Sequence, residues 1–447
     1  MTRKVIAGIA IGVGAALVVL AIGWPGWFET AELKTYDWRM RTMAQLRIAR
    51  GVPLVHPDIV LVEITDASVR DLSDLVGRWP WPRAVHGMLL EYISSGKPKV
   101  IAVDLTLLEP ERESTYKFGD GQMKSVESDQ ALADAAERAG NVVVLADAVD
   151  AGIDDGRLDQ KEWTSPPYRL GPAIEERPVV TLPYPQLHAS ASLGHNFIAL
   201  DEDGPARRFP PFIRQGSRYM PLLGVAAALT GGGFRPDEVQ LRGDTIEIRD
   251  RRIPLVPVTV ADVKDPSKTH TQQTMLINYR APALVNGKRP YPSYEASLLL
   301  KSLSQVETGE KPDISADVFK DKIVFIGVAF SGLVDVFQTP FGKGSMIGIQ
   351  LHASVADSIL SNQFLAPAPR WTAVAAILGT AVAIGLMAST LSFWIAALGA
   401  GGLSLIWTGT TMAAFDRGSW LALAQPLAAM AVALFVGTAY RYFVEDA

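Results

Sequence analysis

Residues 5–22 read VIAGIAIGVGAALVVLAI, an apolar run without a charged side chain. A helix of this length crosses the hydrocarbon core of a bilayer. Arg3 and Lys4 precede the run, and the excess of positive charge on cytoplasmic segments places the N-terminus in the cytoplasm and the following residues outside. The sequence WPGW at 24–27 stands where a signal peptide would have small residues for cleavage, so we expect a retained anchor.

Three more apolar stretches, at residues 371–390, 393–415 and 420–440, contain no acidic or basic side chain. Each is about 20 residues long, as a spanning helix requires. We expect a multi-pass protein of the plasma (inner) membrane, with the lipid bilayer as a partner and both termini in the cytoplasm. The expected layout is a cytoplasmic segment at 1–4, a span at 5–22, an extracytoplasmic domain at 23–370, the three closing spans, and a cytoplasmic segment at 441–447.

Charge and composition argue against several classes of protein. The net charge is −5 and the pI is about 5.8, without a basic stripe, so we expect no nucleic-acid partner. The absence of cysteine removes disulfides, thiolate nucleophiles and sulfur-ligated metals. The six histidines show no metal-ligand spacing, and no catalytic constellation is recognisable. We therefore expect no metal, no cofactor and no catalytic site.

The long polar segment alternates short apolar runs with helical patterns, which predicts an α/β domain with a mostly parallel sheet. A β-hairpin or meander is expected as an insertion at 241–248 and 250–255, where residues alternate between tight turns. Residues 147–185, rich in Pro, Asp and Glu, are expected to form long surface loops. The predicted strands are 59–64, 100–103, 141–145, 275–278 and 323–326, and the predicted helices are 83–94, 129–139, 221–229 and 351–360.

Acidic residues follow three of the predicted strands: Asp66, Asp104 and Asp335. Ligands of open parallel sheets bind beyond the carboxyl ends of the strands, so these side chains are candidates for one ligand crevice. The competing interpretation is that each aspartate caps a helix or turn. His352, near the start of a predicted helix, is a further candidate ligand residue, with packing or capping as the alternative.

The motif WPWPR at 79–83 is a rigid turn that leads into the predicted helix at Arg83. Trp79 and Trp81 are candidates for a stacking wall, and Arg83 is a candidate anion contact. A purely structural corner is the alternative.

Two segments are candidates for transmitting a signal. Gly8 and Gly12 form a small-xxx-small step that allows another helix to approach closely. The pattern of residues 29–41 predicts an amphipathic helix. We expect the membrane helix to break at Pro25 and this second helix to continue the chain outside. An ordinary linker helix is the alternative. This helix is expected to carry Leu33, Tyr36 and Met40 on its apolar face, with Asp37, Arg39 and Arg41 elsewhere.

Several motifs together resemble the CHASE sensory domain of the second type, the cyclase/histidine-kinase-associated sensory extracellular domain. The resemblance covers roughly residues 29–365 and extends to the three closing membrane helices. One departure is Thr65, where the family pattern more often has a second acidic residue beside Asp66; this puts a metal role for Asp66 in doubt. The motifs are LKTYDWR at 33–39, IVLVEITDAS at 59–68, WPWPR at 79–83, VIAVD at 100–104, GHNF at 194–197, DEDG at 201–204, INYR at 277–280, KIVFIG at 322–327, DVFQTP at 335–340 and GIQLHA at 348–353.

The resemblance implies a bacterial membrane-anchored module that detects an extracytoplasmic ligand and signals to a cytoplasmic nucleotide cyclase, histidine kinase or Ser/Thr kinase. The sequence shows no such output domain before Ala447, so we expect a separate output protein, or a natural product longer than this chain. A homodimer is expected, with the first span and the helix at 29–41 at or near its two-fold axis. The alternative function is a membrane-anchored cell-envelope hydrolase that uses Asp66 and Asp104 as an acid/base pair.

Overall fold

The structure is a computed structural model that describes residues 2–23, 26–118, 121–149, 163–177, 179–198, 201, 203–261, 267–330 and 336–445. The chain divides into two compact units. The first unit combines Met1–Gln45 with Leu365–Ala447, and the second is Leu46–Phe364.

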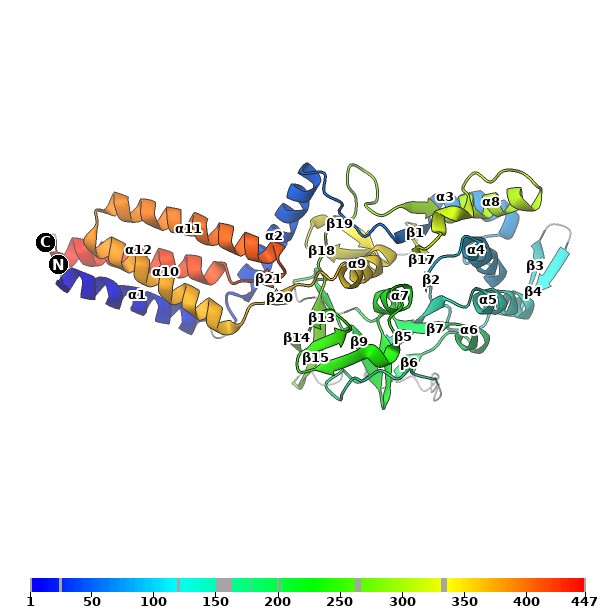
Figure 1. Cartoon of the computed structure of the whole chain (residues 1–447), viewed down its shortest axis with the longest axis horizontal. Helices are drawn as coiled ribbons and strands as arrows, with labels where there is room; N and C mark the ends of the chain where they lie inside the picture. Colours follow the sequence, from blue (N-terminus) through cyan, green and yellow to red (C-terminus); the bar gives the residue numbers. More distant parts are fainter. Residues whose placement is uncertain are drawn as a thin grey trace. The chain divides into compact units, whose positions relative to one another are not determined.

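Four helices of the first unit are long and apolar enough to cross a membrane, counted over the described residues. Helix α1 packs against α10 and α12 (Figure 1). Small side chains such as Ala16, Ala381 and Ala433 form the core between them. The helices are α1 (Thr2–Gly23), α10 (Arg370–Thr390), α11 (Phe393–Asp416) and α12 (Ala424–Tyr440), the last followed by a π-helical turn at Arg441–Glu445.

The last helix begins later than the sequence predicts. Strand β21 (Ser419–Trp420) pairs in parallel with β20 (Ala366–Pro367), so the backbone at Trp420 is extended, and the helix starts at Ala424. Apolar composition alone did not distinguish this short strand from a helix. The expected break at Pro25 lies outside the described residues.

Helix α2 (Glu29–Ala49) extends the predicted amphipathic helix. Leu33, Tyr36 and Met40 are buried, as their spacing predicts. Asp37 and Arg39, which we expected away from the apolar face, are buried as well. The face of α2 that packs in the first unit is therefore partly polar.

The second unit is built on the predicted mostly parallel sheet. All six residues of β1 are buried, in agreement with an apolar strand covered on both faces. Strand β6 runs antiparallel to β5, whereas the other strands run parallel to their neighbours. In spatial order the strands are β16 (Ser293–Glu295), β1 (Ile59–Ile64), β17 (Ile323–Val328), β2 (Val100–Asp104) and β5 (Val142–Val149), and β5 also pairs with β6 (Val179–Thr181) and β7 (Ser192–His195).

Helices cover both faces of this sheet (Figure 1). On one face Val62, Ile101 and Val324 pack in a core with leucines of the covering helices. On the other face, Gly231 of α7 lies directly against Ile323 and Val100. The first face carries α3 (Asp66–Val76), α4 (Arg83–Ser95), α5 (Ser125–Ala139), α6 (Pro185–Ser190) and α8 (Ala296–Glu307), and the second carries α7 (Leu223–Gly231) and α9 (Gly348–Leu360).

Small antiparallel sheets surround the parallel one. The predicted meander is present, formed by β11, β12 and β13. The run at 275–278, predicted as a strand of the parallel sheet, instead ends β15, which pairs with β14 and β8. These elements are β3 (Thr115–Phe118), β4 (Gly121–Lys124), β8 (Arg208–Phe209), β9 (Phe212–Gln215), β10 (Arg218–Pro221), β11 (Val239–Arg242), β12 (Thr245–Ile248), β13 (Arg251–Pro254), β14 (Val256–Ala261), β15 (Thr269–Leu276), β18 (Val336–Thr339) and β19 (Gly342–Ile347), with 3-10 turns at Pro236–Glu238 and Ala316–Phe319.

The described residues of the segment 147–185 contain strands and buried side chains, where we expected long surface loops. Strand β5 runs on to Val149 and pairs there with β6. Trp163 and Ile174 are buried, because this segment also packs against the small sheets. Residues 150–162 and 178 lie outside the described part of the chain.

Candidate ligand-binding site

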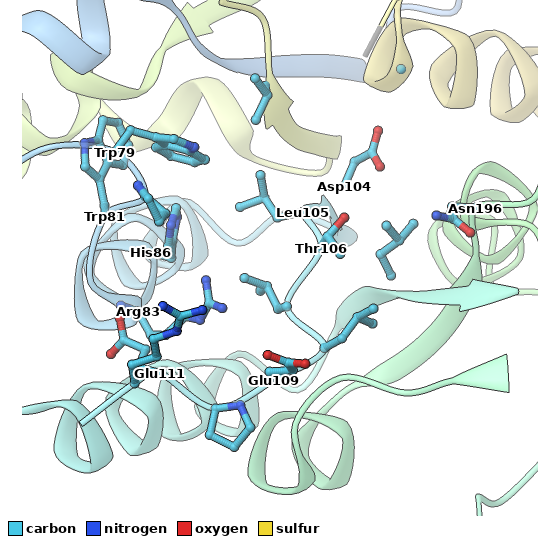
Figure 2. Close-up of a pocket in the computed structure, with 18 of the residues that line it drawn as sticks. Trp79, Trp81, Arg83, His86, Asp104, Leu105, Thr106, Glu109, Glu111 and Asn196 are labelled. Atoms are coloured by element: carbon cyan, nitrogen blue, oxygen red, sulfur yellow. Dashed lines mark hydrogen bonds between the residues drawn. The ribbon is translucent and has the colours of Figure 1, made fainter. Parts of the chain in front are cut away.

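A cavity of about 960 Å³ opens at the carboxyl ends of the central strands (Figure 2). Strands β17 and β2 are neighbours, but β2 leads to α5 on one face of the sheet and β17 leads to α9 on the other. Loops that leave adjacent strands toward opposite faces open a crevice between them, which is where ligands of open α/β sheets bind. The cavity is therefore at the topological switch point of the fold.

The loop after β2 is fastened to the first turn of α4. The Glu111 carboxylate accepts a hydrogen bond from the backbone N–H of Arg83 at 3.0 Å and another from the Tyr116 hydroxyl at 3.2 Å. Ser128 Oγ accepts the next backbone N–H of the helix, from Ala84, at 2.9 Å. Pro82, at the N-cap position, offers no side-chain cap, so these distant groups satisfy the free N–H groups of the turn.

Three rings form an aromatic wall on the α4 side. The ring centroids of Trp79 and Trp81 are 5.2 Å apart, and each lies 5.8 Å from the centroid of His86. Burial and, to a smaller extent, the nearby positive charge of Arg83 together lower the pKa of His86 to about 3. The wall is therefore uncharged at neutral pH.

The opposite wall is formed by Asp104, the last residue of β2, and His352 of α9. His352 Nε2 lies 4.0 Å from Asp104 Oδ2, and both side chains are almost completely buried. Burial lowers the pKa of His352 to about 3, so the imidazole is neutral and the contact is not an ion pair at neutral pH.

Further charges line the cavity at the loop after β2. Glu109 and Arg112 are exposed, and Arg83 is partly buried. Within the described part of the chain, none of these three side chains has an oppositely charged group within 4.0 Å. The cavity can therefore offer both signs of charge to a ligand.

The contact between α1 and α10 in the first unit depends on glycine. A Cβ atom on Gly8 would lie 2.8 Å from the carbonyl oxygen of Gly385, and a Cβ atom on Gly12 would lie 2.7 Å from that of Ala381. Both distances are too short for a side chain, so the two helix backbones touch at these positions.

Polar groups of α2 hold the start of α12. The Glu32 carboxylate accepts hydrogen bonds from the backbone N–H groups of Leu423, Ala424 and Gln425 at 2.8 to 3.3 Å. Arg39 donates to the carbonyl oxygen of Leu421 at 2.8 Å. Burial lowers the pKa of Arg39 to about 10, a shift that Glu32 partly opposes, so the guanidinium remains charged at neutral pH.

Tyr36 completes this junction. Its ring lies edge-on to Phe415 and Trp420, with centroids 5.2 and 5.0 Å away. Together with Glu32 and Arg39, it ties α2 to the segment that joins α11 and α12.

The chain matches the CHASE2 domain over residues 14–387, which is most of its length. It belongs to the CHASE2 family. CHASE2 is a family of sensory extracellular domains. No curated protein and no solved structure matches the chain.

Five residues singled out in this CHASE2 sequence lie around the one cavity: Trp79, Trp81, Arg83, Asp104 and His352. Figure 2 shows the first four of these together with His86 and Glu111. Their roles in binding stay predictions.

Two predicted site residues are not part of this group. Asp66 is exposed in the first turn of α3 and does not line the cavity. Thr65, the residue that departs from the family pattern, is the N-cap of α3, and its hydroxyl accepts the N–H of Ser68 at 3.0 Å. Asp335 lies outside the described residues.

Sequence reasoning missed His86, Glu109, Glu111 and Asn196, which also line the CHASE2 cavity. His86 follows Arg83 by three residues, so helical spacing places both on one side of α4, and this signal was available. The acidic residues of the loop have no periodicity that could have identified them. Among the described residues, no group of three or more His, Asp or Glu side chains is arranged to hold a metal ion.

Proposed function

We propose that this CHASE2 protein is a membrane-anchored sensor whose second unit binds a small ligand outside the cytoplasm. The observation that carries the proposal is the cavity at the switch point of the sheet, lined by Trp81, Arg83, Asp104 and His352. Its volume suits a small molecule, and it combines aromatic surface with a few polar groups, as ligand pockets do. Membership of a sensory family supports the same function.

In this proposal one span precedes the sensory unit and three follow it. Arg3 and Lys4 before α1 favour a cytoplasmic N-terminus, and an even number of spans returns the C-terminus to the cytoplasm. The protein is then a multi-pass protein of the inner membrane.

Signal transmission is proposed to use α2 and α12. The chain passes from the first unit to the second between Gln45 and Leu46, within α2. Because Glu32 and Arg39 bind the backbone at the start of α12, a shift of α2 changes the contacts of a membrane helix. The output, a nucleotide cyclase or a kinase, is then biased from outside.

A homodimer is the proposed form. The glycine face of α1, at Gly8 and Gly12, is already covered by α10 of the same chain. A second copy therefore has to use another face of α1, such as that of Ile6, Leu17 and Val18, which is exposed within the single chain.

The proposal is tested with the full chain in lipid nanodiscs. A library of small metabolites is screened by thermal shift, because a ligand that binds only the folded protein raises its melting temperature. Every hit is then measured on Arg83→Gln and Asp104→Asn, with Arg78→Gln and Asp74→Asn as exposed controls outside the cavity. We expect the hits to be lost in the two cavity variants and kept in the controls. Hits that bind all four variants equally would contradict the proposal.

The alternative of a hydrolase requires two facing carboxylates. Asp104 lines the cavity and Asp66 does not, so no observation favours this pair as acid and base.

A further inference from the structure

Several polar side-chain atoms around the cavity are buried and have no hydrogen-bond partner among the described residues. Nε1–H of Trp81 and Nε–H of Arg83 are donors of this kind, and Oε2 of Glu111 is an acceptor. Nδ1 of His86 and Nδ1 of His352 are in the same position, and a neutral imidazole nitrogen donates or accepts according to its tautomer. All five residues line the cavity, and Trp81, His86 and His352 are almost completely buried. Buried polar atoms normally have a partner, which a polar ligand in this cavity can supply.

The two oxygens of the Glu111 carboxylate differ in their contacts. Oε1 accepts hydrogen bonds from the backbone N–H of Arg83 at 3.0 Å and from the Tyr116 hydroxyl at 3.2 Å. Oε2 has no partner among the described residues. One oxygen therefore fixes the position of the carboxylate, and the other can accept a hydrogen bond from a ligand.

Charges of both signs lie on the α4 side of the cavity. Arg83 and Arg112 are positive, and Glu109 and Glu111 are negative. An anion that binds the arginines also meets the carboxylates, and a cation that binds the carboxylates also meets the arginines. Neither sign of ligand charge is favoured, so a neutral ligand fits this side best. Such a ligand does not need the Asp104 carboxylate, which is already engaged.

A neutral ligand must then offer donors and acceptors close together. A hydroxyl group donates one hydrogen bond and accepts up to two. One hydroxyl can therefore accept from Arg83 and donate to Glu111. Hydrogen bonds to charged side chains are stronger than those between neutral groups, and they require no charge on the ligand. Neighbouring hydroxyl groups on one ring match this set of side chains.

Trp79 supplies apolar surface for the body of such a ligand. Its indole lines the cavity and is partly exposed. The rings of Trp81, His86 and Phe330 contact it edge-on, with centroids 5.2, 5.8 and 5.4 Å away, and so fix the plane of the indole. The face of an indole ring is electronegative, and it attracts C–H groups that neighbouring oxygens have made slightly positive. A sugar ring has such C–H groups on its faces and hydroxyl groups around its edge.

We propose that the cavity binds a neutral saccharide, with a pyranose ring on Trp79 and hydroxyl groups hydrogen-bonded to Arg83 and Glu111. Figure 2 shows these three side chains along one side of the cavity. The volume of about 960 Å³ is within the range of small-ligand pockets. This inference rests on the proposed sensor function and specifies the chemical class of the ligand.

The test uses D-glucose, N-acetyl-D-glucosamine and cellobiose as neutral probes, measured by isothermal titration calorimetry on the full chain in nanodiscs. D-glucuronate, which adds a carboxylate, is compared with D-glucose. D-glucosamine, which carries an ammonium group, is compared with N-acetyl-D-glucosamine. We expect at least one neutral probe to bind, and both charged sugars to bind about tenfold more weakly than their neutral counterparts, because each added charge meets a like charge in the cavity.

Two variants assign the contacts. Trp79→Leu removes the indole and is expected to abolish binding. In Glu111→Gln the amide oxygen can still accept from the Arg83 N–H and Tyr116, but an amide donor replaces the acceptor Oε2, so binding is expected to weaken about tenfold. Trp38→Leu and Glu113→Gln change exposed residues outside the cavity and are expected to bind like wild type. The melting temperature without a probe shows whether each variant is folded, and Glu111→Gln decides the matter if Trp79→Leu is not.

Three outcomes overturn the inference: no binding of any neutral probe at millimolar concentration, charged sugars that bind as well as their neutral counterparts, or binding that Glu111→Gln leaves unchanged. If the metabolite screen instead yields another class of ligand that the cavity variants abolish, the saccharide inference fails and the sensor proposal stands. If no ligand depends on the cavity, both fail.

Discussion

Three imidazoles, those of His86, His195 and His352, are buried in the sensory unit and lie close to or in the wall of its cavity. Burial is the main cause that lowers the pKa of each, to about 3 for His86 and His352. A ligand therefore meets neutral rings at physiological pH. These histidines are not suited to sense mild acidification by a change of charge in the folded state.

These pKa values predict that acid destabilises the unit. An unfolded histidine has a pKa near 6.5, so between pH 6.5 and pH 3 the unfolded chain binds protons that folded His86 and His352 do not. Stability is thus complete above pH 6.5 and falls as the pH decreases, by about 1.4 kcal/mol at pH 5.5 for each buried imidazole.

The measurement is urea unfolding of the full chain, followed by tryptophan fluorescence between pH 7.5 and pH 4.5. His86→Phe keeps a ring in the aromatic wall and is expected to remove the share of one imidazole from the pH dependence. His188→Phe, a change at a partly exposed residue, serves as the control. An unchanged pH dependence in His86→Phe would show that this imidazole is not held neutral by burial.

The burial of one charged residue, Arg39, could not be predicted from the sequence. Helical spacing correctly identified the buried Leu33, Tyr36 and Met40, but it placed Arg39 with the polar residues. Arg39 can be buried because its guanidinium donates a hydrogen bond to the carbonyl oxygen of Leu421, a residue far away in the sequence. Hydrophobic periodicity carries no information about such partners, so it could not reveal them.

At the scale of elements, α12 depends on a cap from another helix. Leu423, its N-cap residue, has no capping side chain, and the Glu32 carboxylate accepts the first free N–H groups instead. A carboxylate at a helix N-terminus also interacts favourably with the helix dipole.

Glu32→Gln is therefore expected to weaken the start of α12 by about 1 kcal/mol, the usual contribution of an N-cap. A lower melting temperature of the full chain in nanodiscs, and faster amide hydrogen exchange at Leu423 and Ala424, would report this loss. Glu29→Gln, at the exposed beginning of the same helix, is the control. Equal exchange rates in wild type and Glu32→Gln would exclude the capping role.

The contact between α1 and α10 makes a prediction about glycine. At Gly12 a methyl group would collide with the backbone of Ala381 and Val382, whereas at Gly14 it would meet nothing within 4 Å. Gly12→Ala is expected to lower the melting temperature in nanodiscs, with a loss of about 1–3 kcal/mol as for overpacked sites. Gly14→Ala is the matched control and should melt like wild type or higher. If the two variants melt alike, the helices do not pack as described.

Strands were predictable where they are buried on both faces. The apolar runs of β1, β2 and β17 marked the centre of the parallel sheet. The edge strand β16 and strand β7 carry polar or small residues and gave no such signal. The prediction for the run at 275–278 was wrong, because β15 pairs with β8 and not with the parallel sheet. An apolar run predicts that a strand is buried, as Met275 and Leu276 are, but it does not predict which strands lie beside it.

At the scale of the whole molecule, the chain has two compact units, and each unit has its own hydrophobic core. The carboxyl-end rule for parallel sheets predicted the position of the cavity, with Asp104 at its edge. It could not predict the contribution of the loop at 105–112, because loop residues have no periodic pattern. The same rule wrongly predicted that Asp66 lies in this cavity. Asp66 is in the first turn of α3 and does not line the cavity.

We propose that the second unit, Leu46–Phe364, faces away from the cytoplasm, and its position can be measured by labelling because this sequence contains no cysteine. Single cysteines are introduced as Asp74→Cys in the sensory unit and Lys4→Cys before α1, and spheroplasts are treated with a membrane-impermeant maleimide. We expect the cysteine at position 74 to react in intact spheroplasts and the cysteine at position 4 to react only after the membrane is permeabilised. The opposite pattern would contradict it.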